Sequence, residues 1–212
     1  LLMLHDGGTE DAVLDLLGVG TGTRLLDVAA GTGATSLVAA ARGAEVVATD
    51  FAPGMVEIAA RRLRDGGHDR CTARVMDGQA LDRPADAVDA GVSMVGLMCC
   101  PGAAAGGAEL ARVVRTGGRI GIATWDLEGF PMHRMIGGAL EAVVPGIGDQ
   151  PRPAPTWAPL GTSAGLDDLL RSAGLADVEV IEVERHWHFE DPARYFREMP
   201  SWSSPVRPLF EM

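Results

Sequence analysis

The chain has 212 residues, enough for one domain with a sizeable core, and a formal net charge of −11. All 18 basic residues are arginine, and they form no basic stripe of the kind that neutralises phosphates, which argues against a nucleic-acid substrate. No secretion signal and no apolar run of about 18 residues is evident, so we expect a cytoplasmic protein without a membrane span.

Residues 1–18 are expected to form a helix that leads to the first strand. The segment Thr9-Glu10-Asp11 supplies good capping and first-turn chemistry, and Gly18 ends the apolar pattern. Residues 24–28 follow as an apolar run that is typical of a buried strand in a parallel sheet.

A glycine turn and a helix come directly after this strand. Gly31 and Gly33 let the backbone turn sharply and approach a ligand, and residues 34–42 are rich in helix formers. The order of strand, glycine turn and helix indicates a nucleotide pocket. A dinucleotide fingerprint would need a third glycine where Ser36 stands, and a P-loop would need a lysine, which the chain lacks.

The pattern Asp27-x-Ala29-x-Gly31-x-Gly33 instead resembles motif I of the class I methyltransferases that depend on S-adenosylmethionine (SAM). The resemblance implies that these four positions line the cofactor site. It also implies that the turn amides and the helix N-terminus receive the methionine part of SAM rather than phosphates.

Residues 44–50 form a second short strand that ends in Asp50, about 19 residues after Gly31. A carboxylate there can accept hydrogen bonds from both ribose hydroxyls, although Asp50 could also cap the helix that follows. This helix is similar to the family's D-x-S-x-x-M-x-x-x-A-R segment, which implies that Phe51 and Met55 offer apolar surface to the adenine.

An acidic turn follows the third strand, within residues 74–81. The resemblance implies that Asp77 accepts from the adenine amino group while the amide of Gly78 or Gln79 reads a ring nitrogen. In isolation, a plain surface turn explains an Asp-Gly pair equally well.

The fourth strand and its loop lie within residues 88–98, which are similar to the family's F-D-x-V-x-S-x-x-x-L stretch. The resemblance implies that Ser93 and Met94 place backbone carbonyls near the methionine amino group. It also implies that Leu97 and Met98 face the acceptor, although either side chain could equally fill the core.

A helix, a Gly-Gly turn and a fifth strand are expected over residues 109–125, similar to the family's L-x-R-V-L-x-P-G-G-x-L signature. Trp125 could shape an aromatic acceptor pocket. Beyond it we expect helices over 130–144 and 164–173, and a half-exposed sixth strand over 178–184, where apolar and polar residues alternate.

The resemblance covers roughly residues 12–125 and implies an α/β fold: a Rossmann-like, doubly wound, mostly parallel sheet with helices on both faces. The sheet could be incomplete at the termini. We expect a single domain over 1–212, with a SAM-binding core at 8–125. Acceptor-side lid helices and the C-terminal part of the sheet are expected at 126–212.

The implied function is methyl transfer from SAM to an oxygen, nitrogen or carbon of a small-molecule acceptor in secondary metabolism, with S-adenosylhomocysteine (SAH) as product. His133 and His5 are the candidate general bases, and His133 could also contact the acceptor. Three alternatives stay open: SAM as a scaffold for cyclisation or another non-methylating step, an NAD-type oxidoreductase, and a non-catalytic ligand-binding regulator. No metal site is expected, and the pocket could be completed in a homodimer.

Overall fold

The computed structural model describes residues 8–126, 141, 158–183, 191, 194, 197 and 198. His5, His133 and the helix expected over 130–144 lie outside the described positions, apart from residue 141. Residues 10–181 form one compact unit, and residues 1–9 together with 182–212 form a second. In the second unit the Arg194 Nε donates to the Glu198 Oε1 at 2.9 Å. The candidate site lies in the first unit.

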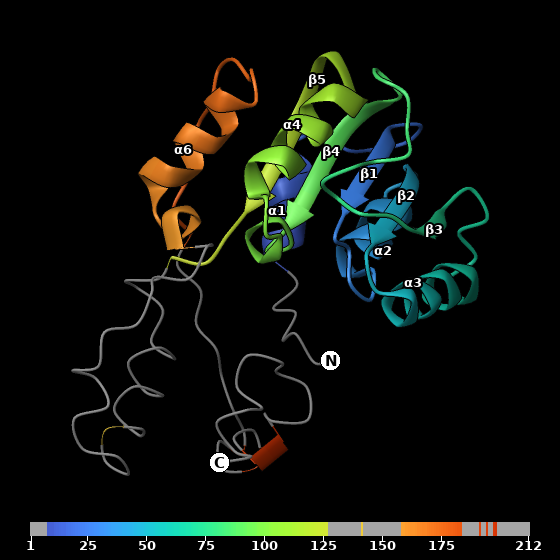
Figure 1. Cartoon of the computed structure of the whole chain (residues 1–212). Coiled ribbons are helices and arrows are strands. Elements are labelled where there is room, and N and C mark those ends of the chain that lie inside the picture. The colour runs from blue at the N-terminus through green and yellow to red at the C-terminus, as the bar shows by residue number, and fades with distance from the viewer. Residues whose placement is uncertain are drawn as a thin grey trace. The chain divides into compact units, whose positions relative to one another are not determined.

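A parallel sheet of five strands forms the centre of the first unit, in the order β3-β2-β1-β4-β5 (Figure 1). The strands are β1 (Arg24–Val28), β2 (Glu45–Asp50), β3 (Thr72–Val75), β4 (Val88–Met94) and β5 (Val114–Ala123). The order reverses at β1, so a switch point lies between β1 and β4, and ligands of open α/β sheets bind at the carboxyl ends of the strands there. The expected fold class is confirmed.

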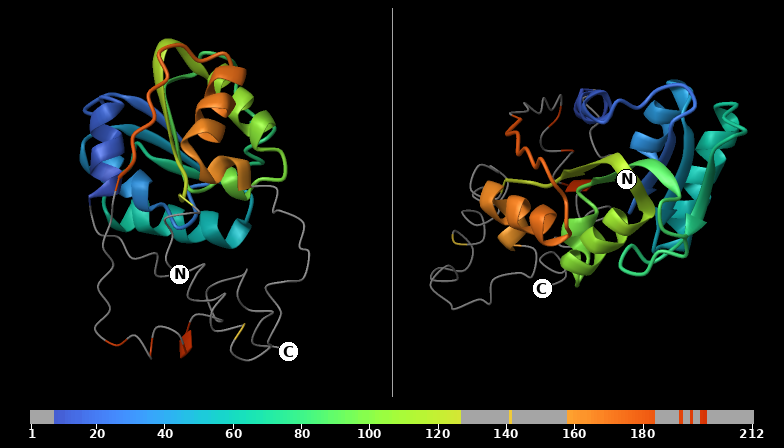
Figure 2. Two further views of the ribbon diagram at one scale, coloured as in Figure 1. Left: turned by 90° about the vertical axis from the view of Figure 1, so that its left-hand side faces the viewer. Right: turned by 90° about the horizontal axis from the view of Figure 1, so that it is seen from above.

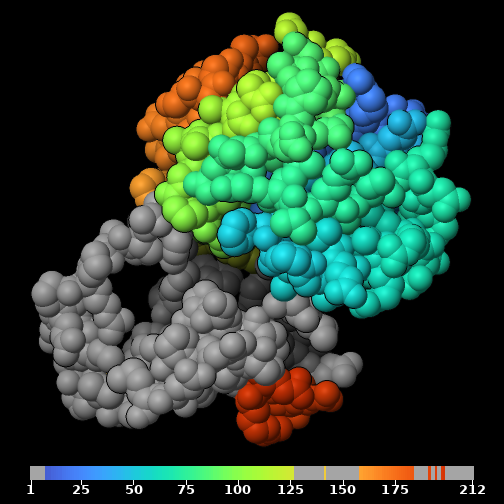
Figure 3. Space-filling view, turned by 45° about the vertical axis from the view of Figure 1, so that its right-hand side comes forward, coloured from blue at the N-terminus to red at the C-terminus, as the bar shows by residue number. Residues whose placement is uncertain are grey.

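Helices cover both faces of the sheet (Figures 1 and 2). One face carries α1 (Thr9–Leu16), α2 (Ala34–Ala41) and α3 (Pro53–Asp65), and the other carries α4 (Ala103–Val113) and α6 (Ser163–Ser172). Two short 3-10 helices are η1 (Leu97–Cys99) and η2 (Ala158–Gly161). On the surface, the segment between β3 and β4 (green) lies against α4 (yellow-green, Figure 3). No helix in the described part of the chain is long and apolar enough to cross a membrane.

The helices bury apolar side chains that the sequence places at helical spacing. Leu14 of α1 and Leu63 of α3 pack with Val46 and Val92 of the sheet in one core cluster. Leu110 of α4 belongs to a second cluster with further residues of β1, β4 and η1. Burying each leucine contributes about 1.5–3 kcal/mol.

The expected Gly-Gly turn is a bulge within β5. Val114 pairs with Val88 and Arg119 pairs with Ala90, so residues 115–118 of β5 lie opposite the single residue 89 of β4. Gly117 has a φ of +74°, a conformation that glycine adopts without steric cost. The strand thus begins before the glycines and not after them, and the glycines form its bulge.

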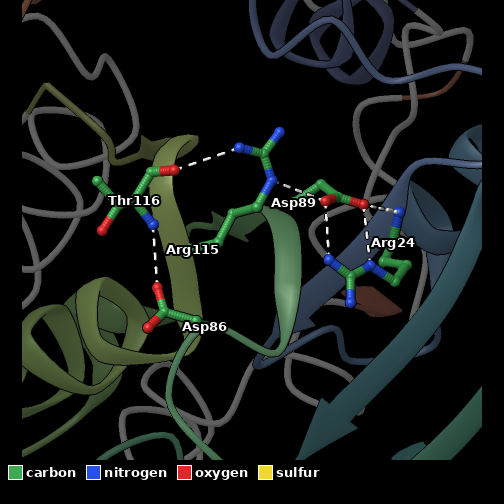
Figure 4. Close-up of polar contacts among 5 residues, drawn as sticks. All are labelled: Arg24, Asp86, Asp89, Arg115 and Thr116. Carbon is green, nitrogen blue, oxygen red and sulfur yellow. Dashed lines mark hydrogen bonds and ion pairs between the residues drawn. The ribbon is translucent and has the colours of Figure 1, made fainter.

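Asp89 holds three strands together at the amino edge of the sheet (Figure 4). Its carboxylate accepts from the Arg24 side chain at 2.9 and 3.1 Å, from the Arg24 backbone N–H at 3.0 Å, and from the Arg115 Nε at 2.9 Å. The hydrogen bonds from Arg24 hold the pKa of Asp89 well below its ordinary value. Beside this cluster, Asp86 Oδ1 accepts from the Thr116 N–H at 3.0 Å.

Asp89→Asn is expected to lower the midpoint of urea unfolding near neutral pH. Because the folded pKa of Asp89 is depressed, the ionised carboxylate stabilises the fold above its unfolded pKa, and this contribution is lost as the pH falls. The ion pairs are partly exposed, so the difference between D89N and wild type should shrink in about 1 M salt, where the Debye length is about 3 Å. Asp69→Asn, at an exposed position after α3, is the control. Equal midpoints for D89N and D69N would contradict this assignment.

The sixth strand expected over 178–184 is wrong for its described residues. Residues 178–183 are in no strand, and Ile181 and Val183 are 50% and 54% exposed. Alternating polarity marks a segment as amphipathic. However, it becomes a strand only when a neighbouring strand takes its backbone hydrogen bonds. Among the described strands, β5 pairs only with β4.

Candidate functional site

The glycine turn between β1 and α2 lies at the carboxyl edge of the sheet. Ala29, Gly31 and Gly33 have φ values of +56°, +55° and +79°. A Cβ at Gly31 would meet nothing within 4 Å, whereas one at Gly33 would lie 3.0 Å from the Ala59 Cβ of α3. Gly33 is thus needed for helix packing, while Gly31 leaves space for a ligand to approach the backbone.

Asp50, the last residue of β2, connects this turn to the start of α3. Its Oδ2 accepts from the Gly31 N–H at 2.8 Å and its Oδ1 from the Ala52 N–H at 2.9 Å. The N-cap of α3 is Ala52, which has no side-chain cap, so Asp50 supports the helix start without being the cap itself. Each carboxylate oxygen keeps a second acceptor position for a ligand.

Asp27 lies beneath the turn and is only 1% exposed. The Ser36 hydroxyl donates to its Oδ2 at 2.6 Å. Burial raises the pKa of Asp27 to about 7, and the hydrogen bonds from Ser36 oppose this shift. The serine that breaks the dinucleotide fingerprint is therefore the partner of the motif I acid, a role that sequence reasoning missed.

Arg62 of α3 is a second residue that sequence reasoning missed. Its Nη1 donates to the Thr32 carbonyl at 2.8 Å and to the Thr32 hydroxyl at 3.2 Å, between the two turn glycines. The turn is therefore held by Asp50 at the Gly31 N–H and by Arg62 at the Thr32 carbonyl. A turn fixed before its ligand arrives costs less to order on binding.

The residues expected around the adenine lie at the ends of β2 and β3. Phe51 is 76% exposed and Met55 is half-buried. Asp77 is exposed, and its Oδ1 accepts from the Gln79 backbone and side chain at 2.9 and 3.1 Å. These bonds lower the pKa of Asp77.

The loop after β4 lies beside the glycine turn. Ser93 is fully buried and its Oγ accepts from the Leu97 N–H at 3.1 Å, while Met94 is half-buried. Leu97 is fully buried in the core with α4, and Met98 packs with Trp125 in the cluster beneath α6. An acceptor role for Leu97, Met98 and Trp125 stays a prediction. The described residues hold no group of three or more side chains suited to a metal.

Gly96→Ala is expected to destabilise the fold. A Cβ at Gly96 would lie 2.4 Å from the Ala29 Cβ, and overpacking of this kind costs about 1–3 kcal/mol. Adding Ala29→Gly removes the clashing methyl and the strain of a non-glycine residue at positive φ, so the double variant should regain part of the lost stability. Urea unfolding of the wild type, G96A and the double variant tests this. A double variant no more stable than G96A alone would show that Ala29 is not the obstacle.

Comparison with known proteins finds a domain match in the same part of the chain. Residues 25–118 match the family model described as "Methyltransferase domain". Over 176 residues, the chain is 33% identical to an uncharacterized protein of Mycobacterium tuberculosis, covering 81% of this chain and 63% of that protein. It is 42% identical over 113 residues to the demethylmenaquinone methyltransferase of Clavibacter sepedonicus, covering 53% and 45%.

A SAM-dependent methyltransferase from Aquifex aeolicus has a similar structure, with a TM-score of 0.64 over 82% of this chain and 84% of that one at 19% identity. At this identity the likeness shows the fold alone. Residues 25–118 are therefore a methyltransferase domain. The chain spans less than two thirds of the length of these two curated relatives.

The site offers groups that suit SAM as a cofactor. They are the open space at Gly31, the Asp50 carboxylate bonded to the Gly31 N–H, and the exposed ring of Phe51 next to Asp50 in the sequence. The match to a methyltransferase domain disfavours the NAD-type alternative. Ser36 also disfavours it, because a dinucleotide fingerprint would need a glycine at that position.

Proposed function

We propose that this domain transfers the methyl group of SAM to a small-molecule acceptor and releases SAH. The observation that carries the proposal is the pairing of Asp50 Oδ2 with the Gly31 N–H at 2.8 Å, because it brings an acid and an open glycine turn together at the carboxyl edge of the sheet, next to the switch point. The net charge of −11 favours an acceptor other than a nucleic acid.

Each part of the cofactor is assigned to residues at one edge of the sheet. The remaining acceptor positions of Asp50 bind the ribose hydroxyls, and the glycine turn receives the methionine part. Phe51 and Met55 pack on the adenine, whose amino group donates to Asp77. Ala29, Ser93 and Met94 line the methionine side with their backbones. Of the two expected amides, that of Gly78 is the one offered to the adenine ring, because the Gln79 N–H donates to Asp77 Oδ1 at 2.9 Å.

The bound cofactor supplies an activated methyl group on a sulfonium, which is already a good leaving group. The task of the protein is then to hold the acceptor atom about 3 Å from that methyl, in line, and to exclude water. Motif I implied that Asp27 lines the cofactor site. Because its side chain is only 1% exposed and is bonded by Ser36, we assign it instead to holding the turn from beneath.

The demethylmenaquinone methyltransferase named above supports a quinone-like ring as the first acceptor to try. Four further points stay predictions: the base roles of His5 and His133, the cytoplasmic location, the place in secondary metabolism, and the homodimer.

The test uses SAM labelled in its methyl group. The protein is incubated with labelled SAM and a panel of acceptors that includes demethylmenaquinone, and mass spectrometry follows SAH and the acceptor. We expect equal amounts of SAH and of an acceptor that carries the label. If an acceptor is converted without the label while SAM is recovered intact, the scaffold alternative holds. If SAM binds and nothing in the panel changes, non-catalytic binding is favoured and the proposal fails for these acceptors.

A further inference from the structure

The side chain of Gln79 connects two segments that the proposed cofactor site does not otherwise join. Its Nε2 donates to the Asp77 Oδ1 at 3.1 Å, and its Oε1 accepts from the Gly102 N–H at 2.7 Å. Gly102 is the residue before α4, 23 positions along the chain. The proposed adenine turn is thereby bonded to the start of α4.

The orientation of this amide is fixed by the chemistry of its two partners. The Gly102 N–H is a donor and needs the amide oxygen, whereas the ionised Asp77 carboxylate only accepts and needs the amide nitrogen. A Cβ at position 102 would lie 2.7 Å from the Gln79 Oε1, so the short contact depends on glycine there.

The same contact region packs η1 against α4. A Cβ at Gly106 would lie 2.2 Å from the Leu97 Cδ2 and 3.5 Å from the Gly78 carbonyl, so α4 approaches both segments closely. Figure 3 shows the segment between β3 and β4 lying against α4 on the surface. The Asp77 turn is therefore held from the side of α4, by an element that itself belongs to the core.

Both hydrogen bonds that Gln79 donates to Asp77 reach the same oxygen. The backbone N–H bonds Oδ1 at 2.9 Å and the side chain bonds it at 3.1 Å, which fixes the rotation of the carboxyl group. The second oxygen, Oδ2, then keeps a defined direction for an external donor. An exocyclic amine can donate to it, whereas the carbonyl of hypoxanthine would face it with a second acceptor.

We propose that Gln79 is a positioning residue that sets the preference of this site for adenine over hypoxanthine by fixing the Asp77 carboxylate against α4. This inference rests on the proposed function, because it requires the adenosine part of SAM to meet Asp77. It assigns the side chain of Gln79 a role distinct from that of its backbone amide.

The experiment measures two dissociation constants by calorimetry, one for SAH and one for its deaminated analogue S-inosylhomocysteine. The wild type should prefer SAH by about 10-fold or more, the worth of one hydrogen bond to a charged group. Gln79→Met removes both side-chain bonds and should bring the ratio down by at least about 3-fold. Gln79→Glu keeps an acceptor for the Gly102 N–H but places an anion beside Asp77. It should therefore lower the ratio, while its midpoint of urea unfolding should change less than that of Q79M.

A double-mutant cycle separates positioning from a general structural effect. In an Asp77→Asn background, Q79M should leave the ratio unchanged, because the group through which Gln79 acts is already altered. The inference is overturned if Q79M weakens both ligands equally, or if it changes the ratio as much in D77N as in wild type. If the wild type binds neither ligand, the proposed function itself fails. If the wild type binds SAH tightly and the ratio is unchanged in Q79M and Q79E, the role of Gln79 is refuted while the proposed function stands.

Discussion

Asp50→Asn is expected to weaken SAM binding by about 100-fold. The carboxylate accepts from the Gly31 and Ala52 N–H groups with different oxygens, and an asparagine can serve only one of them. The ribose hydroxyls also lose a charged acceptor. Hydrogen bonds to charged groups contribute about 1.5–3 kcal/mol each, and 1.4 kcal/mol corresponds to about tenfold in affinity. Calorimetric titration with SAM measures the change.

Asp65→Asn is the matched control for this variant. Asp65 is the exposed last residue of α3, so its replacement removes the same charge without touching the turn. D65N should bind SAM like the wild type. An affinity of D50N within about 3-fold of that of D65N would show that the cofactor does not rely on the Asp50 carboxylate.

Asp27→Asn is expected to change how stability depends on pH. The folded pKa of Asp27 is about 7, against an ordinary value of 3.8, so between these values the folded state holds a proton that the unfolded state has released. The stability that Asp27 contributes is therefore fully present below about pH 4 and is lost as the pH rises through 7. A shift of this size corresponds to about 4 kcal/mol across that window.

The comparison is made by urea unfolding of wild type and D27N from about pH 5 to about pH 8. The free energy of unfolding of the wild type should fall with rising pH more steeply than that of D27N, because asparagine does not titrate. D65N should keep the wild-type slope. Parallel curves for wild type and D27N would mean that the buried carboxyl has an ordinary pKa, and would refute the role given to Ser36 and burial.

The elements around the site were predictable because local patterns determine them. An apolar run of strand length before Gly31 and Gly33 indicates a buried strand and a sharp turn, and the acid that ends β2 is visible as a break in apolar sequence. The same holds for the Gly-Gly segment, which the structure shows as a bulge in β5.

The start of α4 could not be found in this way. The expected helix began near residue 109, whereas α4 begins at Ala103 and contains Gly106 and Gly107. Two glycines normally disfavour a helix, by about 1 kcal/mol each. Here Gly106 is required because the side chain of Leu97 occupies the space of a Cβ, a contact between segments that no local pattern reveals.

The partners that hold the site in place were also hidden from the sequence. Ser36 and Arg62 act on motif I residues 9 and 30 positions away, and Gln79 joins its neighbour Asp77 to Gly102, 23 positions further along the chain. Only the fold makes these longer-range contacts. The sixth strand failed for a related reason, since a strand depends on a neighbour that its own sequence does not describe.

The measurement that tests the central claim most directly is a calorimetric titration of the protein with SAM and, separately, with NADH. We expect saturable binding of SAM with a dissociation constant within about 1 μM–1 mM, a range typical of enzyme substrates, and no binding heat with NADH. Binding of NADH without binding of SAM would contradict the assignment of the glycine turn, Asp50 and Asp77 to a SAM site.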